Sequence, residues 1–282
     1  MKGSIGLLPN WDKKHTAKIV EQVYYFFDQA GIPVKTLPRG SHILTDHFSE
    51  QITSWKEEVE LIVVVGGDGT ILKVARELVE WEIPVLGINA GHKGFLAETE
   101  ITNLQECLHY LLEGNYYVNE RVILHTNVKR KGETTLDFMA VNDVVLSRGP
   151  FSRIIDLDVY INQEYLETYS GDGVILSTST GSTAYSLSAG GPIVHPSLEV
   201  LVITPVCPHS LYNRSVIVSA SEAICIKVAS SHADIVLTMD GQVGFRLQKG
   251  DSVKTSRSSH KVKLVSFPSS SFYKLLHHKL KG

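Results

Sequence analysis

Residues 61–70 read LIVVVGGDGT, an apolar run that ends in a glycine-rich turn, and this stretch decides the fold. Leu61 to Val65 is short, wholly apolar and rich in β-branched residues, which is typical of a strand covered on both faces of a sheet. Similar runs occur at Ile5 to Leu8 and at Pro84 to Ile88. Helices are expected over Trp11 to Ala30, Ile71 to about Trp81, and about Asn103 to Glu113. This alternation predicts right-handed βαβ units and a parallel sheet.

From about Tyr116 the sequence changes from helical spacing to short strands. Ile155, Leu157, Val159 and Ile161 alternate with polar residues, the period of a half-buried antiparallel strand. The strand-like runs are Val118 to Val128, Leu136 to Leu146, Ile154 to Ile161, Val200 to Thr204, Ile224 to Val228, Ile235 to Met239 and Val262 to Val265. The second half is therefore predicted to be an all-β sandwich.

Two domains are expected from this change of period. The first, residues 1–118, is an α/β nucleotide-binding domain that carries the glycine-rich turn, and the second, residues 119–265, is the β-sandwich. The tail, residues 266–282, is expected to pack back on the first domain. Its last part, Ser271 to Gly282, is predicted to be a helix with apolar residues on one face: Phe272, Leu275, Leu276 and Leu280.

Composition excludes several classes of protein. With 27 basic and 30 acidic residues, the net charge of −3 gives no basic field for nucleic acid or anionic lipid. The three cysteines form no C-x-x-C pair and no two histidines have metal-ligand spacing, so neither a disulfide framework nor a zinc cluster is expected. No apolar run approaches the ~18 residues of a membrane span, and the N-terminus lacks a signal peptide's long apolar region. We expect a cytoplasmic protein.

The turn Gly66-Gly67-Asp68-Gly69-Thr70 is a candidate phosphate site. A strand that ends in glycines and opens into a helix presents unpaired N–H groups and the positive end of the helix dipole, both of which favour phosphate. The carboxyl ends of parallel strands are also where open α/β sheets bind ligands. The string is neither G-x-G-x-x-G, because position 72 is Leu72, nor a P-loop.

An acidic side chain inside such a turn requires its own explanation. Asp68 would repel bare phosphate, so we expect it to bind a metal, to accept a proton or to contact ligand hydroxyl groups. The alternative is a tight turn that uses Gly-Asp-Gly only for its backbone angles.

Two further polar stretches lie in the second half. Asn142 and Asp143 interrupt an apolar pattern from Met139 to Leu146, which is costly unless both are hydrogen-bonded. An Asn suits an adenine edge and a carboxylate suits ribose hydroxyls; an edge strand or bulge with solvated side chains is the alternative. The run from Ser170 to Pro196 is dense in glycine and hydroxylated residues, which indicates either a loop packed on a ligand or a polar surface loop.

Asp240-Gly241-Gln242 follows an apolar strand and is interpreted as a hairpin turn.

Together these strings resemble the NAD kinase family. The GGDGT turn, the NDVVL strand at 142–146, the TGSTAYSLSAGGPIVHP block at 180–196, the CPHSL string at 207–211 and the MDGQ turn at 239–242 occur in that family's order and spacing. The resemblance covers roughly residues 60 to 245. GGDGT alone also occurs in diacylglycerol and sphingosine kinases, with a related turn in phosphofructokinases, but the block at 180–196 separates NAD kinases from them.

The resemblance implies a phosphofructokinase-like or diacylglycerol-kinase-like α/β domain followed by a β-sandwich. It implies phosphorylation of the 2′-hydroxyl of the adenosine ribose of NAD, with ATP or polyphosphate as donor and Mg²⁺ bridging the triphosphate. NAD and ATP are the expected partners. A homodimer or homotetramer is also implied, in which a neighbouring subunit completes the NAD site.

Residue roles follow from the same resemblance. Asp68 would accept the proton of the attacking hydroxyl or orient its oxygen. Phosphate or ATP would contact Gly66, Gly67, Gly69 and Thr70. NAD would contact Asp68, Gly69, Phe95, Asn142, Asp143, Asp172, Thr180, Thr183, Ala184, Tyr185 and Ser188.

The sequence departs from the family at two positions. Ser179 replaces a usual Pro, which predicts a less rigid loop, and Asp143 stands where many members have Glu, which shortens the reach of the carboxylate. A lipid kinase that shares the GGDGT turn would act on diacylglycerol-like substrates. A non-catalytic NAD-sensing module would bind NAD without forming NADP.

Overall fold

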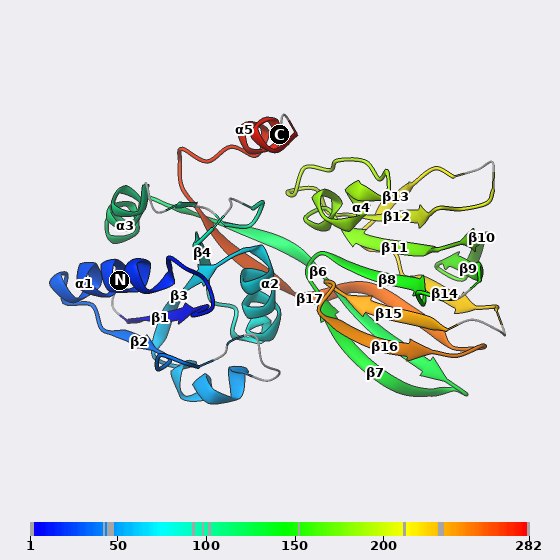
Figure 1. The fold of residues 1–282 in the computed structure, drawn as a ribbon, viewed down its shortest axis with the longest axis horizontal. Helices are drawn as coiled ribbons and strands as arrows, with labels where there is room; N and C mark the ends of the chain where they lie inside the picture. The colour runs from blue at the N-terminus through cyan, green and yellow to red at the C-terminus, as the bar shows by residue number, and fades with distance from the viewer. Residues whose placement is uncertain are drawn as a thin grey trace. The chain divides into compact units, whose positions relative to one another are not determined.

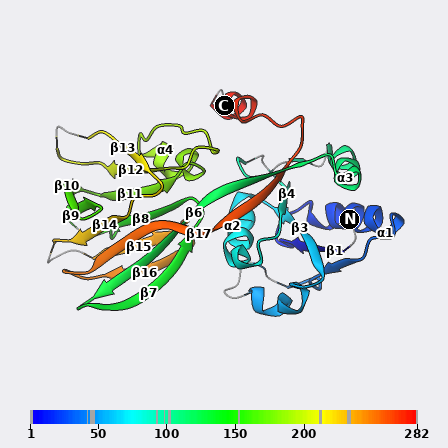
Figure 2. The ribbon, with the colours of Figure 1, turned by 180° about the vertical axis from the view of Figure 1, so that it is seen from behind.

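The structure is a computed structural model that describes residues 3–41, 43, 48–91, 94–97, 99–100, 103–151, 153–210, 213–230 and 234–280. The chain divides into two units, Met1–Glu120 with Val262–Gly282, and Arg121–Lys261. The boundaries fall within two long strands, β6 (Tyr117–Arg130) and β17 (Ser252–Ser266). These strands pair with each other and lie side by side in both views (Figures 1 and 2).

The centre of the first unit is the predicted parallel sheet. Four strands lie in the order β2 (Val34–Thr36), β1 (Ser4–Pro9), β3 (Val59–Gly66) and β4 (Val85–Asn89), all parallel. Beyond β4 the edge is extended by β5 (Thr99–Glu100) at one end of that strand and by Leu264 of β17 opposite Val85. The run LIVVV is buried throughout, as a central strand with helices on both faces requires.

Two helices cover one face of this sheet. They are α1 (Thr16–Gln29) and α3 (Leu104–Glu113), whose apolar residues share one core with alternate residues of β1, β3 and β4 (Figure 1). The buried residues of α1 recur every three or four positions, which is the stripe of an amphipathic helix. This helix begins five residues after Trp11 because Thr16 first closes a turn, its hydroxyl donating to the Asn10 carbonyl at 2.7 Å.

The other face of the sheet is covered by α2 (Asp68–Glu77), which follows β3 directly. A Cβ on Gly87 of β4 would meet Ile71 of α2 at 2.4 Å, so glycine lets the helix pack closely on the strand. The expected helix ends earlier than predicted, and Val79–Trp81 forms a separate 3₁₀ turn. A second 3₁₀ segment, Phe48–Trp55, was not predicted.

The second unit is a sandwich of two sheets. One contains β13 (Val216–Ser219), β12 (Val200–Val206), β11 (Gly173–Thr178), β8 (Asp143–Arg148), β15 (Ile235–Met239) and β16 (Val243–Leu247), in that order. The other contains β10 (Glu164–Gly171), β9 (Ile155–Ile161), β14 (Ile224–Val228) and β17, with β6 and β7 (Glu133–Ala140) beyond.

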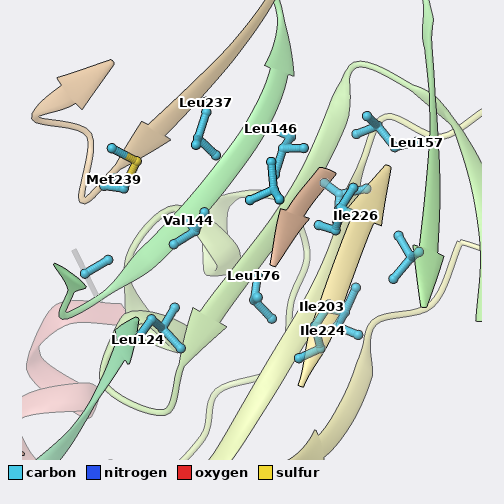
Figure 3. Close-up of a cluster of buried hydrophobic side chains, with 14 of the residues drawn as sticks. Leu124, Val144, Leu146, Leu157, Leu176, Ile203, Ile224, Ile226, Leu237 and Met239 are labelled. Atoms are coloured by element: carbon cyan, nitrogen blue, oxygen red, sulfur yellow. The ribbon is translucent and has the colours of Figure 1, made fainter. Parts of the chain in front are cut away.

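Apolar side chains from both sheets form one core between them. Leu146, Leu176 and Leu237 of the first sheet share this core with Leu157 and Ile226 of the second (Figure 3). The period-two alternation of β9 places Ile155, Leu157 and Val159 in the core, as predicted. The predicted fold class, an α/β domain followed by a β-sandwich, is confirmed.

The C-terminal segment belongs to the first unit. Phe267 is buried in the core of that unit, and its ring lies 5.9 Å from that of Tyr110 on α3. The predicted terminal helix is α5 (Phe272–Leu280), but none of its described residues is buried. Of its apolar residues, Phe272, Leu275 and Leu276 are half-buried and Leu280 is exposed. None of the described helices has the length and hydropathy needed to span a bilayer.

Candidate active site

Asp68 occupies the first position of α2, directly after the carboxyl end of β3. Gly67 caps the helix with extended backbone and has no side chain to bond the first N–H groups. A carboxylate in the first turn is stabilised by the positive end of the helix dipole. The glycine-rich turn is therefore a helix N-terminus, and the predicted helix begins three residues earlier than Ile71.

The Asp68 carboxylate is held by three consecutive backbone N–H groups. Phe95 donates to Oδ2 at 2.7 Å, while Leu96 and Ala97 donate to Oδ1 at 3.2 and 3.3 Å. Gly94 lies so close that a Cβ there would come within 1.9 Å of Oδ1. A segment about 27 residues away in sequence thus fixes the orientation of this carboxylate. His92 and Lys93, quoted with Phe95 in the family string, lie outside the described residues.

The other members of the turn have distinct surroundings. A Cβ on Gly66 would meet the Thr70 side chain at 2.7 Å, so Gly66 is required for the helix to pack over the strand end. No heavy atom of the described residues lies within 4 Å of the Cβ position at Gly67, which leaves room for a ligand. Thr70 is buried and its hydroxyl accepts a hydrogen bond from the Asn10 amide at 2.9 Å.

Asn142 and Asp143 do not lie inside one continuous strand. The run Leu136 to Leu146 was predicted as a single strand, but β7 ends at Ala140 and β8 begins at Asp143. β8 is a central strand between β11 and β15, so the edge-strand alternative is also wrong. The polar pair marks a break between two strands, and this break explains why polar residues interrupt the apolar pattern.

The backbone of this break is bonded to Asp240. Asn142 donates to Asp240 Oδ1 at 2.7 Å, Asp143 to the same oxygen at 3.2 Å, and Val141 to Oδ2 at 3.1 Å. The Asp240 N–H in turn donates to the Asp143 carbonyl at 2.9 Å. The predicted hairpin turn is present between β15 and β16, but the sequence did not reveal that its acidic side chain organises the Asn142 region.

The Asp143 side chain is almost completely buried, with 4% of its surface exposed. Burial, and then the negative charge of Asp240, raise the pKa of its carboxyl from 3.8 to about 7. A carboxylic acid with such a pKa exchanges its proton near neutral pH, and its neutral form can donate a hydrogen bond as well as accept one.

The hydroxyl-rich block lies beside this break. Thr178 donates its N–H to the Asn142 carbonyl at 2.9 Å, and its hydroxyl donates to the Val141 carbonyl at 2.7 Å. A Cβ on Gly181 would come within 2.0 Å of the Asn142 carbonyl oxygen, so only glycine fits there. The structure therefore brings the NDVVL and TGSTAY strings together.

Much of the block's polarity serves the fold rather than a loop on a ligand. It forms a 3₁₀ turn, Gly181–Thr183, and the short helix α4, Tyr185–Ser188. Buried hydroxyls are bonded internally: Ser182 donates to the Ser179 carbonyl at 2.7 Å, and Ser186 pairs with Thr204 at 3.0 Å. In contrast, the candidate binding residues Thr183, Ala184, Tyr185 and Ser188 are partly or largely exposed, whereas Thr180 is buried.

Ser179, which replaces the usual family Pro, is anchored by its side chain. Its hydroxyl donates to the Leu198 carbonyl and lies 3.4 Å from the Val200 carbonyl. This contact ties the block to the segment that enters β12 and opposes the loss of rigidity expected from the replacement.

Asp172 is not part of this cluster within one chain. It precedes β11, whereas Thr180 follows that strand, and its carboxylate pairs with Arg148 Nε at 2.5 Å. Arg148 is the last residue of β8 and Asp143 is the first. Five residues of β-strand place the two about 17 Å apart. The CPHSL string lies at the Asp172 end, because Asp172 donates its N–H to the Val206 carbonyl at 2.9 Å; Leu211 lies outside the described residues.

The fold and these two groups of residues define a two-domain protein with a carboxylate-bearing helix N-terminus and a polar strand break. Two family models match the chain: the ATP-NAD kinase N-terminal domain over residues 5–116 and the ATP-NAD kinase C-terminal domain over residues 141–267. The chain belongs to the ATP-NAD kinase family.

Individual relatives agree with this membership. The chain is 46% identical over 280 residues to the NAD kinase of Natranaerobius thermophilus, covering 99% of this chain and 98% of the relative. It is 39% identical to the NAD kinase of Moorella thermoacetica, covering 98% and 89%. The solved yeast NADH kinase complexed with NADH superposes with a TM-score of 0.81 at 26% identity, covering 100% of this chain and 89% of that one. An Archaeoglobus fulgidus NAD kinase in complex with ATP shares the fold, with a TM-score of 0.74 at 22% identity over 99% and 98% of the chains.

Proposed function

We propose that this chain is an NAD kinase, which transfers the terminal phosphoryl group of ATP to the 2′-hydroxyl of the adenosine ribose of NAD and so forms NADP. The observation that carries the proposal is the Asp68 carboxylate, fixed by three N–H groups at a helix N-terminus. Family membership supports the reaction, since relatives that match almost the whole chain are named NAD kinases. The yeast and archaeal structures carry NADH and ATP respectively.

Asp68 is proposed to orient the attacking hydroxyl and to take its proton. An ionised carboxylate offers about four acceptor positions. Three are used by the N–H groups of residues 95–97, which leaves one for the hydrogen of a sugar hydroxyl. Phosphoryl transfer passes through a loose transition state, so proton transfer can lag behind cleavage of the P–O bond and correct placement of the oxygen matters most.

The phosphates of the donor are assigned to the turn that surrounds Asp68. Gly67 offers open space beside the first N–H groups of α2, where the dipole favours negative charge. Gly66, Gly69 and Thr70 complete this phosphate-binding turn.

The adenosine part of NAD is assigned to the residues around the strand break. Asn142 supplies an amide and Asp143 a carboxyl group, and among the described residues neither side chain has a hydrogen-bond partner. Thr180, Thr183, Ala184, Tyr185 and Ser188 belong to the neighbouring block of the same unit. Phe95 belongs to the first unit, in the segment that holds Asp68, and is assigned to NAD from family membership.

Mg²⁺ would be carried by the phosphate oxygens of ATP. The described residues contain no group of three or more His, Cys, Asp or Glu side chains that could hold a metal ion. Mg²⁺ is usually bound by one or two carboxylates together with substrate phosphates, so an ion that enters with the nucleotide would need few ligands from the protein. Bound in this way it would neutralise charge on the transferred group.

We also propose that Asp172 acts on the NAD site of a second copy of the chain. About 17 Å of strand separates it from Asp143 in its own chain, too far for both to contact the same ribose. Mixing inactive Asp68→Ala and Asp172→Ala subunits should then restore part of the activity, because a hybrid oligomer contains complete sites. No recovery under conditions in which wild-type subunits exchange would refute a shared site.

The deciding experiment is a coupled assay with purified protein, NAD, Mg²⁺ and either ATP or polyphosphate, with NADP as the readout. Wild-type protein should form NADP, and Asp68→Ala should lower turnover at least ~100-fold while NAD binding, measured by calorimetry, survives. Near-normal turnover in this variant would remove Asp68 from the mechanism. NAD binding without NADP would favour the sensing module, and phosphorylation of diacylglycerol in place of NAD would favour the lipid kinase.

A further inference from the structure

Asp240 adopts a backbone conformation that most residues avoid. Its φ of 50° lies in the left-handed region, which disfavours side chains other than those of Gly, Asn and Asp. Gly241 follows it with a φ of 63°, so both central residues of the β15–β16 hairpin are left-handed, as a tight hairpin turn requires. The turn alone would be satisfied by glycine at both positions. An Asp-Gly pair also suits the turn, so the backbone conformation alone does not show whether the acidic side chain has a further role.

A further role is indicated by the contacts of this side chain with the neighbouring break between β7 and β8. The two carboxylate oxygens of Asp240 accept the three consecutive N–H groups of Val141, Asn142 and Asp143. On the other side, Thr178 holds the carbonyls of Val141 and Asn142. The backbone polar groups of the break are thereby bonded within the protein.

This arrangement fixes the backbone that carries the side chains of Asn142 and Asp143. The Asp240 N–H bonds the Asp143 carbonyl, so the hairpin and the first residue of β8 are joined in both directions. Asn142 cannot move toward the hydroxyl-rich block, because Gly181 already packs against its carbonyl. With its backbone immobilised, the Asn142–Asp143 pair does not have to be ordered when a ligand binds.

We propose that Asp240 is a positioning residue for NAD: it contacts no substrate, but it holds Asn142 and Asp143 in the geometry that receives the adenosine part of the dinucleotide. The inference rests on the proposed function and extends it to a residue that the reaction itself does not require. It predicts a loss confined to NAD binding, since Asp68 and the phosphate-binding turn belong to the other unit of the chain.

The test compares substitutions at two left-handed turns of the same unit. Asp240→Gly removes all three acceptor contacts and keeps a backbone that suits the turn. Lys131→Gly is the matched control, because Lys131 has a φ of 51° in the β6–β7 hairpin, away from the candidate site residues. Asp240→Asn is the conservative variant, which retains one acceptor oxygen and has the same shape. For each protein the assay measures kcat, the KM values for NAD and ATP, and NAD affinity by calorimetry.

We expect Asp240→Gly to raise the KM and the Kd for NAD at least tenfold, with kcat at saturating NAD and the KM for ATP within about threefold of wild type. The KM and Kd for NAD of Asp240→Asn should lie between those of wild type and Asp240→Gly. Those of Lys131→Gly should match wild type. The inference is overturned if Asp240→Gly has the NAD affinity of Lys131→Gly, or if kcat and both KM values deteriorate together. If Asp240→Gly fails to fold, the same comparison is made with Asp240→Asn: its KM and Kd for NAD should rise while kcat and the KM for ATP stay close to wild type. If wild-type protein forms no NADP the proposed function fails, whereas the calorimetric comparison still tests Asp240.

Discussion

Replacing Asp143 by asparagine tests the electrostatics of the strand break through stability alone, without any assumption about substrates. Asp143 is buried beside the charge of Asp240, and its pKa is raised from 3.8 to about 7. A carboxyl whose pKa is higher in the folded state keeps its proton there while the unfolded chain has already lost it. The folded protein then binds more protons than the unfolded chain, so its stability falls as pH rises.

The size of the effect follows from the pKa. A change from 3.8 to about 7 corresponds to about 4 kcal/mol, at about 1.4 kcal/mol for each tenfold change in the proton equilibrium. The contribution is fully present below pH 3.8, declines between about pH 4 and 7, and is lost above the folded pKa. Asparagine has nearly the same shape and does not titrate. The free energy of unfolding of Asp143→Asn minus that of wild type should therefore rise by up to about 4 kcal/mol from pH 4 to pH 8.

The assay must report on the second unit, because the two units can unfold separately. All three tryptophans, Trp11, Trp55 and Trp81, belong to the first unit. Unfolding followed by tryptophan fluorescence is therefore an internal control, which should give the same transition for Asp143→Asn and wild type. Hydrogen exchange of peptides from β11 and β12, followed in urea at each pH, reports on the sandwich. Comparison with wild type at the same pH cancels the intrinsic pH dependence of exchange.

Glu164→Gln provides the matched charge control. Glu164 is an exposed acid of the same unit. The free energy of unfolding of Glu164→Gln minus that of wild type should therefore stay close to zero at every pH. The reasoning is refuted if the Asp143→Asn difference is constant from pH 4 to pH 8 within about 0.5 kcal/mol. It is equally refuted if the difference falls with rising pH, since that sign would mean that the folded protein stabilises the ionised carboxylate.

Two further substitutions test individual contacts. Gly94→Ala should lower turnover at least tenfold without unfolding the protein, because the new Cβ would meet the Asp68 carboxylate. The control Gly91→Ala, whose Cβ would lie 3.9 Å from Asn89 Oδ1, should have normal kinetics. Equal turnover in the two variants would contradict the role given to residues 94–97. Ser179→Ala should destabilise the second unit by about 1 kcal/mol in urea unfolding, because the Leu198 carbonyl loses its donor. Ser221→Ala, which removes an exposed hydroxyl, should cost nothing measurable, and an equal loss in both would show that the Ser179 contact contributes no stability.

The sequence predicts the fold well where one local signal decides it. LIVVV is typical of a strand covered on both faces, and the alternation of β9 is typical of a half-buried strand, so the parallel sheet and the sandwich could be predicted. The beginning of α2 was missed because glycines usually weaken a helix. Here Gly67 is the cap residue and Gly69 lies in the first turn, where the backbone N–H groups have no partner within the helix. The break before Asp143 was missed because Met139 to Leu146 is apolar enough to form one strand.

The membership of the candidate site remains a prediction, whereas the structure shows which of its predicted residues lie together and which do not. Asp172 and Thr180 flank the same strand, so their separation could have been predicted from the run Val174 to Leu176 between them. The hydroxyls of the 180–196 block gave a mixed signal. Those of Ser182 and Ser186 are bonded within the fold and that of Thr183 donates to the Thr180 carbonyl at 3.2 Å, whereas Tyr185 is exposed. Residue type alone does not distinguish these uses, since both depend on which side of a short helix faces the sheet.

Both units contain the same arrangement of hydrogen bonds, which links residues far apart in the sequence and so could not be predicted from local patterns. In each, one aspartate accepts three consecutive backbone N–H groups: Asp68 from residues 95–97, and Asp240 from residues 141–143. The partners are 27 to 29 residues apart in the first case and 97 to 99 in the second, far beyond the reach of helical or strand periodicity. A charged acceptor bonded in this way fixes a loop more strongly than neutral contacts do. The proposed roles of the two side chains differ: one acceptor position of Asp68 is assigned to a ligand, whereas Asp240, whose charge lies beside Asp143, is proposed to act through the residues it holds.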